Sequence, residues 1–183
     1  EFREKLASVV WLKDLGSMLD KSRRIEWLAP AIAKTLEMDE EVAEAARQAG
    51  RLSKADLVTD MVNEFPDLQG AMGRAYALQQ GESNDVAIAI FEQYLPRGAR
   101  DTLPGTDAGA CVALAEKLDS LVGCFGIGLI PSSTADPYAL RRAALGTLRI
   151  LQEREYDIDL ADLLRLGREA YAADERDYPL RDD

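Results

Sequence analysis

The sequence predicts an all-α fold, because its apolar residues recur at helical spacing and not at strand spacing. Between residues 107 and 122, for example, Val112, Ala115, Leu118 and Val122 follow one another three or four positions apart, which places them on one face of a helix. No alternating apolar and polar run of strand length is bounded by turn residues. Residues 127–130 are the one short apolar run that resembles a strand.

The expected helices follow from such stripes and from the residues at their ends. Ser17 and Asp39 are good N-caps, Gly50 and Gly81 are expected to end helices, and Pro30 is expected to kink or divide the helix that contains it. The expected helices cover residues 2–19 with a break near Gly16, 18–36, 39–48, 53–64, 67–80, 84–94, 107–122, 137–151 and 158–173. Residues 96–105 are expected to form a loop.

The rest of the chain is organised around residues 101–151. A helix over residues 107–122 is expected to end at the glycine-rich segment 123–128, since glycine gives up helix stability and takes backbone angles that other residues avoid. Asp136 is a suitable N-cap for the following helix, and Pro137 fits its first position because no helical hydrogen bond is lost there.

The length of 183 residues suits one domain. A chain of this size buries roughly 70% of its unfolded surface, so it needs no disulfide or metal to fold. We expect a helical domain over residues 1–173 and a charged tail, or the start of a linker, over residues 174–183. The chain begins without a methionine inside an expected helix, so we expect it to be a piece from the middle of a longer protein.

The cysteines and the hydropathy indicate a cytoplasmic protein. Cys111 and Cys124 lack CxxC spacing and lie among apolar residues, which is typical of buried thiols in a reducing compartment. No signal peptide and no apolar run of membrane length occurs. We therefore expect no membrane contact.

The charge and the absence of histidine exclude several classes of function. The net charge of −11 argues against a general nucleic-acid binder, although a local basic patch on an acidic body remains compatible with it. Without histidine the chain lacks the commonest general base and the commonest zinc ligand. Glu116 and Asp119 share a helix face and suggest paired-carboxylate catalysis, but a solvated helix face is the simpler interpretation.

Basic residues gather in three places in this acidic sequence. The groups are Lys21 with Arg23 and Arg24, Arg97 with Arg100, and Arg141 and Arg142 with Arg149. Arg141 and Arg142 lie in the first turns of an expected helix, where the helix dipole favours acids, so some other partner must favour them. That partner is either an internal carboxylate (Glu92, Asp101, Asp107 or Asp119) or the phosphate of a nucleic acid.

Long strings of mixed residues resemble the β subunit of bacterial heterotetrameric glycyl-tRNA synthetase. They are ALAEKLDSLVG, GIG and DPYALRRAALGTLRIL in residues 113–151, with KADLVTDMVNEFPDLQGAMGRAY at 54–76 and FREKLASVVWLKDLGSMLDK at 2–21. The resemblance is strong as far as residue 151 and weaker beyond it. Strings of this length are far more specific than a short motif.

The order of helices also resembles the HD domain, a helical fold whose phosphohydrolase members bind a divalent metal through a histidine, a histidine–aspartate pair and a later aspartate. The corresponding positions are Lys21, the pair Ala55 and Asp56, and Glu116. Only Asp56 keeps its residue type, so the sequence predicts a degenerate site with no metal. We expect Lys21, Asp56 and Lys54 to form a polar cluster there, and whether Lys21 pairs with Asp56 in place of the metal stays open.

The resemblance implies a part of glycine–tRNA ligase that has no catalytic residue of its own. The synthetase α subunit would use ATP and Mg²⁺ in the α2β2 assembly, and this domain, which needs no cofactor, would help to position tRNA(Gly). The candidate tRNA-binding residues are Arg97, Arg100, Arg141 and Arg142. Two alternatives stay open, a metal-dependent HD phosphohydrolase and a scaffold domain without RNA contact.

Overall fold

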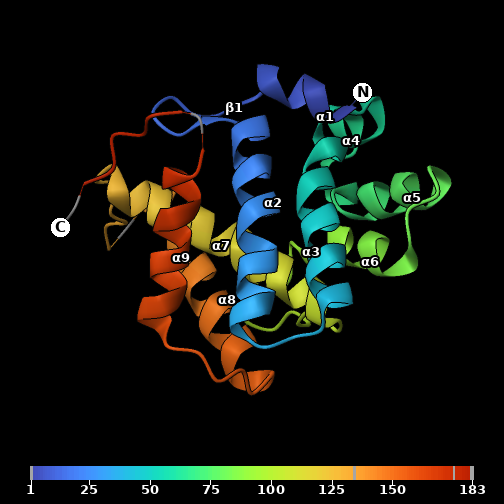
Figure 1. Cartoon of the computed structure of the whole chain (residues 1–183). Helices are drawn as coiled ribbons and strands as arrows, with labels where there is room; N and C mark the ends of the chain where they lie inside the picture. The colour runs from blue at the N-terminus through green and yellow to red at the C-terminus, as the bar shows by residue number, and fades with distance from the viewer. Residues whose placement is uncertain (1, 134, 175, 182–183) are drawn as a thin grey trace.

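The protein is built around two crossing helices, α2 (Met18–Thr35) and α7 (Asp107–Gly126), as Figure 1 shows. The structure is a computed structural model and describes residues 2–133, 135–174 and 176–181. Helix α2 packs against α3, α7 and α9, while α7 also packs against α6 and α8. The other helices are α1 (Phe2–Lys5), α3 (Glu40–Leu52), α4 (Asp60–Glu64), α5 (Ala71–Gln79), α6 (Asn84–Glu92), α8 (Leu140–Glu153) and α9 (Leu160–Ala172). The described residues are mainly helical, as predicted, and one short antiparallel strand pair departs from the all-α prediction.

Several helices begin where a side chain satisfies the free backbone N–H groups of the first turn. Ser17 opens α2 in a capping box, in which the Ser17 hydroxyl accepts from the Asp20 N–H and Asp20 accepts from the Ser17 N–H at 2.7 Å. Ser83 and Thr106 cap α6 and α7 through their hydroxyl groups. These capped starts are the local signals that make helix positions readable from sequence.

Helix α7 is the centre of the core, and neighbouring helices surround it. Ala110, Leu114, Ala115 and Leu118 are fully buried, although they point to different sides of the helix. The helix also runs past the expected end at residue 122 to Gly126. Gly123 lies under the Tyr171 ring and Gly126 under Leu180, so these glycines permit close packing inside the helix and do not stop it.

The N-terminal segment differs from the single helix expected over residues 2–19. After α1 and a short 3₁₀ turn, β1 (Val10–Leu12) pairs antiparallel with β2 (Gly16–Ser17). Val10 and Trp11 favour extended backbone, and Gly16 has a φ of 85°, which turns the chain back toward α2. The expectation that these residues form a helix was therefore wrong.

Other boundaries differ because tertiary contacts override local signals. The helix expected over residues 53–64 is divided into a 3₁₀ turn, Ala55–Val58, and α4, since Thr59 caps a new helix start. The helix expected from residue 67 begins only at Ala71, after Gly70 with its φ of 80°. Helix α2 continues through Pro30 and is not divided there.

The C-terminal residues fold back onto the end of α7. The Tyr178 ring lies 5.0 Å from the Tyr171 ring in an edge-to-face contact, and the backbone N–H of Arg181 donates to Gly126 O at 2.8 Å. The expected boundary at residue 173 stays a prediction, but the residues described beyond it pack on the domain. Cys111 and Cys124 are free and buried, as expected. No helix in the described ranges is long and apolar enough to cross a membrane.

Gly50 lies inside α3, where the sequence predicts the end of the helix, because α3 and α2 are in close contact there. A Cβ at residue 50 would lie 2.9 Å from the backbone oxygen of Ile25 and 3.0 Å from Glu26 Cα. We expect Gly50→Ala to lower the free energy of unfolding by about 1–3 kcal/mol, since two backbones must separate. Urea unfolding measures this. Gly98→Ala, where a Cβ meets nothing within 4 Å, is the control, and equal effects of the two variants would contradict the packing argument.

Candidate nucleic-acid interface and the degenerate metal positions

Lys21 and Glu116, two of the positions that the resemblance to the HD domain suggested as metal-ligand positions, meet between α2 and α7. Lys21 Nζ lies 3.6 Å from Glu116 Oε1. Lys54, which precedes the Ala55–Asp56 pair, approaches the same carboxylate oxygen at 3.3 Å. Its backbone has a φ of 68°, in the left-handed region, at the start of the 3₁₀ turn. Two ammonium groups therefore flank the Glu116 carboxylate.

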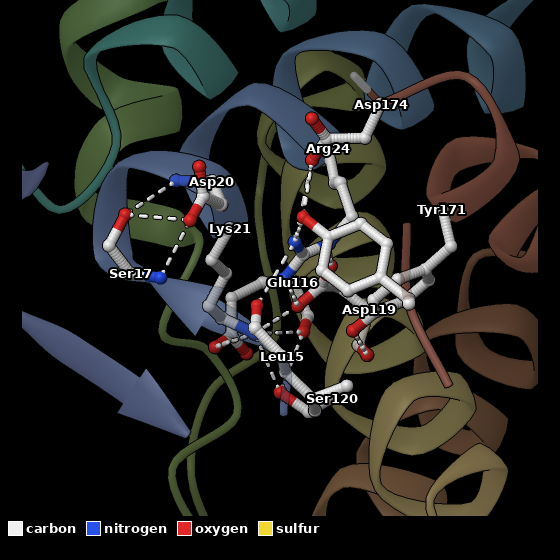
Figure 2. A network of polar contacts seen from close by, with 11 residues as sticks. Leu15, Ser17, Asp20, Lys21, Arg24, Glu116, Asp119, Ser120, Tyr171 and Asp174 are labelled. Carbon is white, nitrogen blue, oxygen red and sulfur yellow. Dashed lines mark hydrogen bonds and ion pairs between the residues drawn. The ribbon is translucent and has the colours of Figure 1, made fainter. Parts of the chain in front are cut away.

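Asp119 accepts hydrogen bonds from two basic side chains of α2 (Figure 2). Its carboxylate accepts from Lys21 Nζ at 2.8 Å and from Arg24 Nε at 2.5 Å, and the side chains of all three residues are almost fully buried. Ser120 accepts a further hydrogen bond from Lys21 at 2.8 Å. Arg24 also lies under the rings of Tyr171 and Tyr178. Lys21 and Arg24 of the basic group thus form ion pairs with the acidic residues at positions 116 and 119.

The ion pairs control the pKa values of both carboxylates. Burial alone would raise the pKa of Glu116, but the ammonium groups of Lys54 and Lys21 lower it to about 2. Burial opposes ionisation of Asp119 as well, yet Arg24 and Lys21 hold its pKa below the usual range. Both groups are ionised at neutral pH and are engaged by cations. Neither is suited to act as a general acid, so the paired-carboxylate hypothesis gains no support.

Asp56 lies apart from this cluster. One of its carboxylate oxygens accepts from the Gly70 N–H at 2.7 Å, and the other is buried without a hydrogen-bond partner among the described residues. Among the described residues Lys21 pairs with Asp119 and Glu116 of α7 and not with Asp56, so the expected polar cluster of Lys21, Asp56 and Lys54 is divided. Asp56 instead fixes the turn before α5.

The residues present do not fit a divalent metal. Two ammonium groups beside Glu116 supply positive charge where a cation would have to bind. The residue at position 55 is alanine, which has no ligand atom. In the described ranges no three histidine, cysteine, aspartate or glutamate side chains are grouped as metal ligands. The chemistry of this donor set favours a structural ion cluster.

A second site forms where the loop after α6 approaches α8, and one buried lysine holds the loop. Lys117 of α7 is 4% exposed, and its ammonium donates to Leu95 O at 2.7 Å. No carboxylate lies within ion-pair distance of it in the described part of the chain. Burial lowers the pKa of Lys117 to about 8, and nearby cations such as Arg142 add to the shift. The sequence analysis did not single out this residue.

Arg149 of α8 also binds the loop. Its guanidinium donates to the carbonyl oxygen of Ala99 at 3.0 Å and pairs with Glu153 at 3.2 Å. In the same loop the Asp101 carboxylate accepts from the Arg97 N–H at 2.6 Å. The loop expected over residues 96–105 is confirmed, and these contacts fix its position relative to α8.

Helix α8 begins at Leu140, three residues later than expected, and its N-cap is Ala139. The expectation that Asp136 is the N-cap and Pro137 the first helical residue was therefore wrong. The Asp136 carboxylate accepts from the backbone N–H groups of Leu140 and Arg141 at 2.8 and 2.9 Å. Arg141 and Arg142 therefore lie in the first turn, as predicted. The Arg141 guanidinium donates to the carbonyl oxygen of Ser132.

The two arginine groups line or adjoin one open pocket of about 490 Å³. Its lining includes Arg141, Arg142 and Arg149 of α8 and Pro96, Gly98 and Ala99 of the loop. The four candidate arginines are all exposed. None of them forms an ion pair with a carboxylate in the described ranges, and the guanidinium groups of Arg100 and Arg142 take part in no hydrogen bond there. Internal pairing thus explains Lys21 and Arg24 but leaves these two guanidinium groups available.

The comparisons with known proteins give the family. The sequence model of the glycyl-tRNA synthetase beta subunit matches residues 1–181. The chain belongs to this family. It is 52% identical over 173 residues to the glycine–tRNA ligase beta subunit of Pseudomonas fluorescens, covering 94% of this chain and 25% of that protein. The beta subunits of Ectopseudomonas mendocina and Lawsonia intracellularis are 55% and 53% identical over 93% and 89% of this chain, and 25% and 23% of their own lengths.

The chain therefore spans about a quarter of the length of the curated beta subunits that it matches. The resemblance seen in the sequence extends over nearly the whole chain, including the part beyond residue 151.

Proposed function

We propose that this chain is an HD-like helical domain of a glycine–tRNA ligase β subunit and that it helps to bind and position tRNA(Gly). Membership of the β-subunit family supports the assignment. The tRNA contact is supported by the exposed arginines around the pocket between the loop 96–101 and α8. Lysine and arginine that neutralise phosphates supply the sequence-independent part of nucleic-acid affinity, and unpaired guanidinium groups are well suited to this because they bind phosphate bidentately.

In this proposal the domain carries out no chemistry. Glycine activation with ATP and Mg²⁺ takes place on the α subunit of an α2β2 assembly, and the β subunit holds the RNA relative to it. The ion cluster of Lys21, Arg24 and Asp119 replaces the metal centre of an HD phosphohydrolase and serves stability. That donor set gives the phosphohydrolase alternative no support.

The test uses the complete enzyme with Arg100→Ala and Arg142→Ala together in the β subunit. Each lost charge-assisted phosphate contact costs about 1–3 kcal/mol, which is about 2–6 kcal/mol for the two together, so kcat/KM for tRNA charging is expected to fall by at least about 30-fold. Glycine-dependent ATP–pyrophosphate exchange without tRNA is expected to stay unchanged, because glycine activation does not involve this surface.

The matched control is Arg47→Ala, which also removes an arginine from a helix surface. Arg47 already pairs with Glu44 and lies 3.5 Å from Glu26, so its loss is expected to leave charging unchanged. Wild-type charging by the double variant would refute the tRNA contact and favour the scaffold alternative. A fall in pyrophosphate exchange would show that the variant disturbs the α subunit.

A further inference from the structure

The pocket between the loop 96–101 and α8 has an apolar wall as well as arginines. Leu145 lines it and is 60% exposed, which places it among the more exposed large apolar side chains of the described residues. Pro96 and Pro137 line it too. A phosphate-binding surface for a regular double helix needs only the cations, so the apolar wall indicates a second kind of contact.

The charge around the pocket is strongly positive. Lys117 lies directly beneath it, since a Cβ added at the lining residue Gly146 would be 2.9 Å from Lys117 Cε. Asp136 is the acidic residue among the lining side chains, and its carboxylate is engaged by the first backbone N–H groups of α8. The helix N-terminus is thus already occupied, and attraction for an anion comes from the side chains of Arg141, Arg142 and Lys117.

We propose that this pocket holds one unpaired nucleotide of the RNA, with the base against Leu145 and the adjoining phosphate at Arg142. The inference rests on the proposed tRNA-binding function. A paired base is stacked inside the helix and does not present its face to a concave surface, whereas an unstacked base packs on apolar and guanidinium groups. The volume of about 490 Å³ lies within the range of sites that bind small molecules.

The test places the photoreactive residue p-benzoylphenylalanine at position 145 of the complete β subunit, assembled with α and mixed with tRNA(Gly). Ultraviolet cross-linking followed by primer extension then identifies the attached nucleotide. We expect a cross-link to an unpaired nucleotide. The same substitution at Leu164, which is 40% exposed on α9, is the control and is expected to give none.

Leu145→Ser supplies an independent readout. Losing about half of the burial of a leucine weakens tRNA binding by about fivefold, and the slope of log affinity against log salt concentration should stay unchanged because no phosphate contact is lost. Arg142→Ala, in contrast, is expected to reduce that slope by about 0.9.

Each outcome separates this inference from the proposed function. A cross-link to a paired nucleotide overturns the unpaired-nucleotide pocket but keeps an RNA contact at this surface. No RNA cross-link, together with impaired charging by the arginine double variant, overturns the pocket and leaves the phosphate contact. A cross-link to the α subunit or to another part of β shows a protein occupant and overturns the inference. Wild-type behaviour of Leu145→Ser and of the arginine double variant overturns both.

Discussion

Replacing Asp119 by alanine is expected to lower the free energy of unfolding by about 3–5 kcal/mol. Asp119 is 1% exposed and binds both Lys21 and Arg24. Without its carboxylate, Arg24 stays buried beside aromatic rings, and Asp174, at 3.6 Å, is the one carboxylate left within ion-pair distance of it among the described residues. Two buried positive charges then face each other with little compensation. Urea unfolding followed by circular dichroism measures the loss.

Asp162→Ala is the control for Asp119→Ala, because it also breaks an aspartate–arginine contact. Asp162 pairs with Arg165 at the surface of α9, where an ion pair contributes no more than about 1 kcal/mol. Equal effects of the two variants would show that burial does not increase the importance of the Asp119 cluster. If Asp119→Ala fails to fold, Asp119→Asn provides the comparison at constant size.

The same cluster sets the acid limit of stability. The folded-state pKa values of Asp119 and Glu116 are below their unfolded values, so their contribution is complete above about pH 5 and is lost progressively as the pH falls toward 2. Asp119→Asn removes the contribution of Asp119 to this dependence of stability on pH. Its free energy of unfolding is therefore expected to change less than that of the wild type between pH 5 and pH 3. A parallel decline of both proteins would contradict the assignment.

Glu92→Ala is expected to lower the free energy of unfolding by about 2–4 kcal/mol. The Glu92 carboxylate is 8% exposed and accepts from the backbone N–H groups of Gly105 and Thr106 at 2.7 and 3.1 Å. It also accepts from the Thr106 hydroxyl at 2.6 Å. The substitution removes the acceptor of three donors, and because Gly105 is exposed and Thr106 is partly buried, each lost hydrogen bond costs about 1 kcal/mol.

Amide hydrogen exchange gives a local readout of the Glu92 variant. Protection of Gly105 and Thr106 is expected to fall more than that of the core of α7, because these two N–H groups lose their acceptor. Glu64→Ala, at an exposed position of α4, is the control and should leave both stability and exchange unchanged. Full protection of Gly105 in Glu92→Ala would show that Glu92 does not anchor the end of the loop.

Local sequence signals predicted the start of a helix correctly where a side chain accepts a hydrogen bond from the first backbone N–H groups of its own helix. Ser17 and Ser83 each accept a hydrogen bond from the N–H group three residues further on, so their role is visible in a short window. Gly50 and Gly123 were misassigned for the opposite reason. Their small size is required by the Ile25 backbone and by Tyr171, which are distant in sequence.

The candidate site also divides into features that a short stretch of sequence reveals and features that depend on residues distant in sequence. The sequence identified the arginine groups at 97–100 and 141–142, because their charge stands out in an acidic chain. It missed Lys117, whose importance comes from lying under Gly146 and bonding to Leu95. It also treated residues 21–24 and residues 116–119 as separate basic and acidic groups, although they neutralise each other across α2 and α7.

The sequence by itself determined the mainly helical class, the capped starts of the principal helices and the β-subunit family, since periodicity, capping and long shared strings are carried by consecutive residues. Only the tertiary structure decided which charges are buried in ion pairs and which arginines remain available around a pocket. The reason is that the effect of a charged side chain depends on how deeply it is buried and on which charged groups lie beside it. Arg24 and Arg142 are the same residue type, and they differ because α7 places Asp119 against one of them and leaves the other exposed.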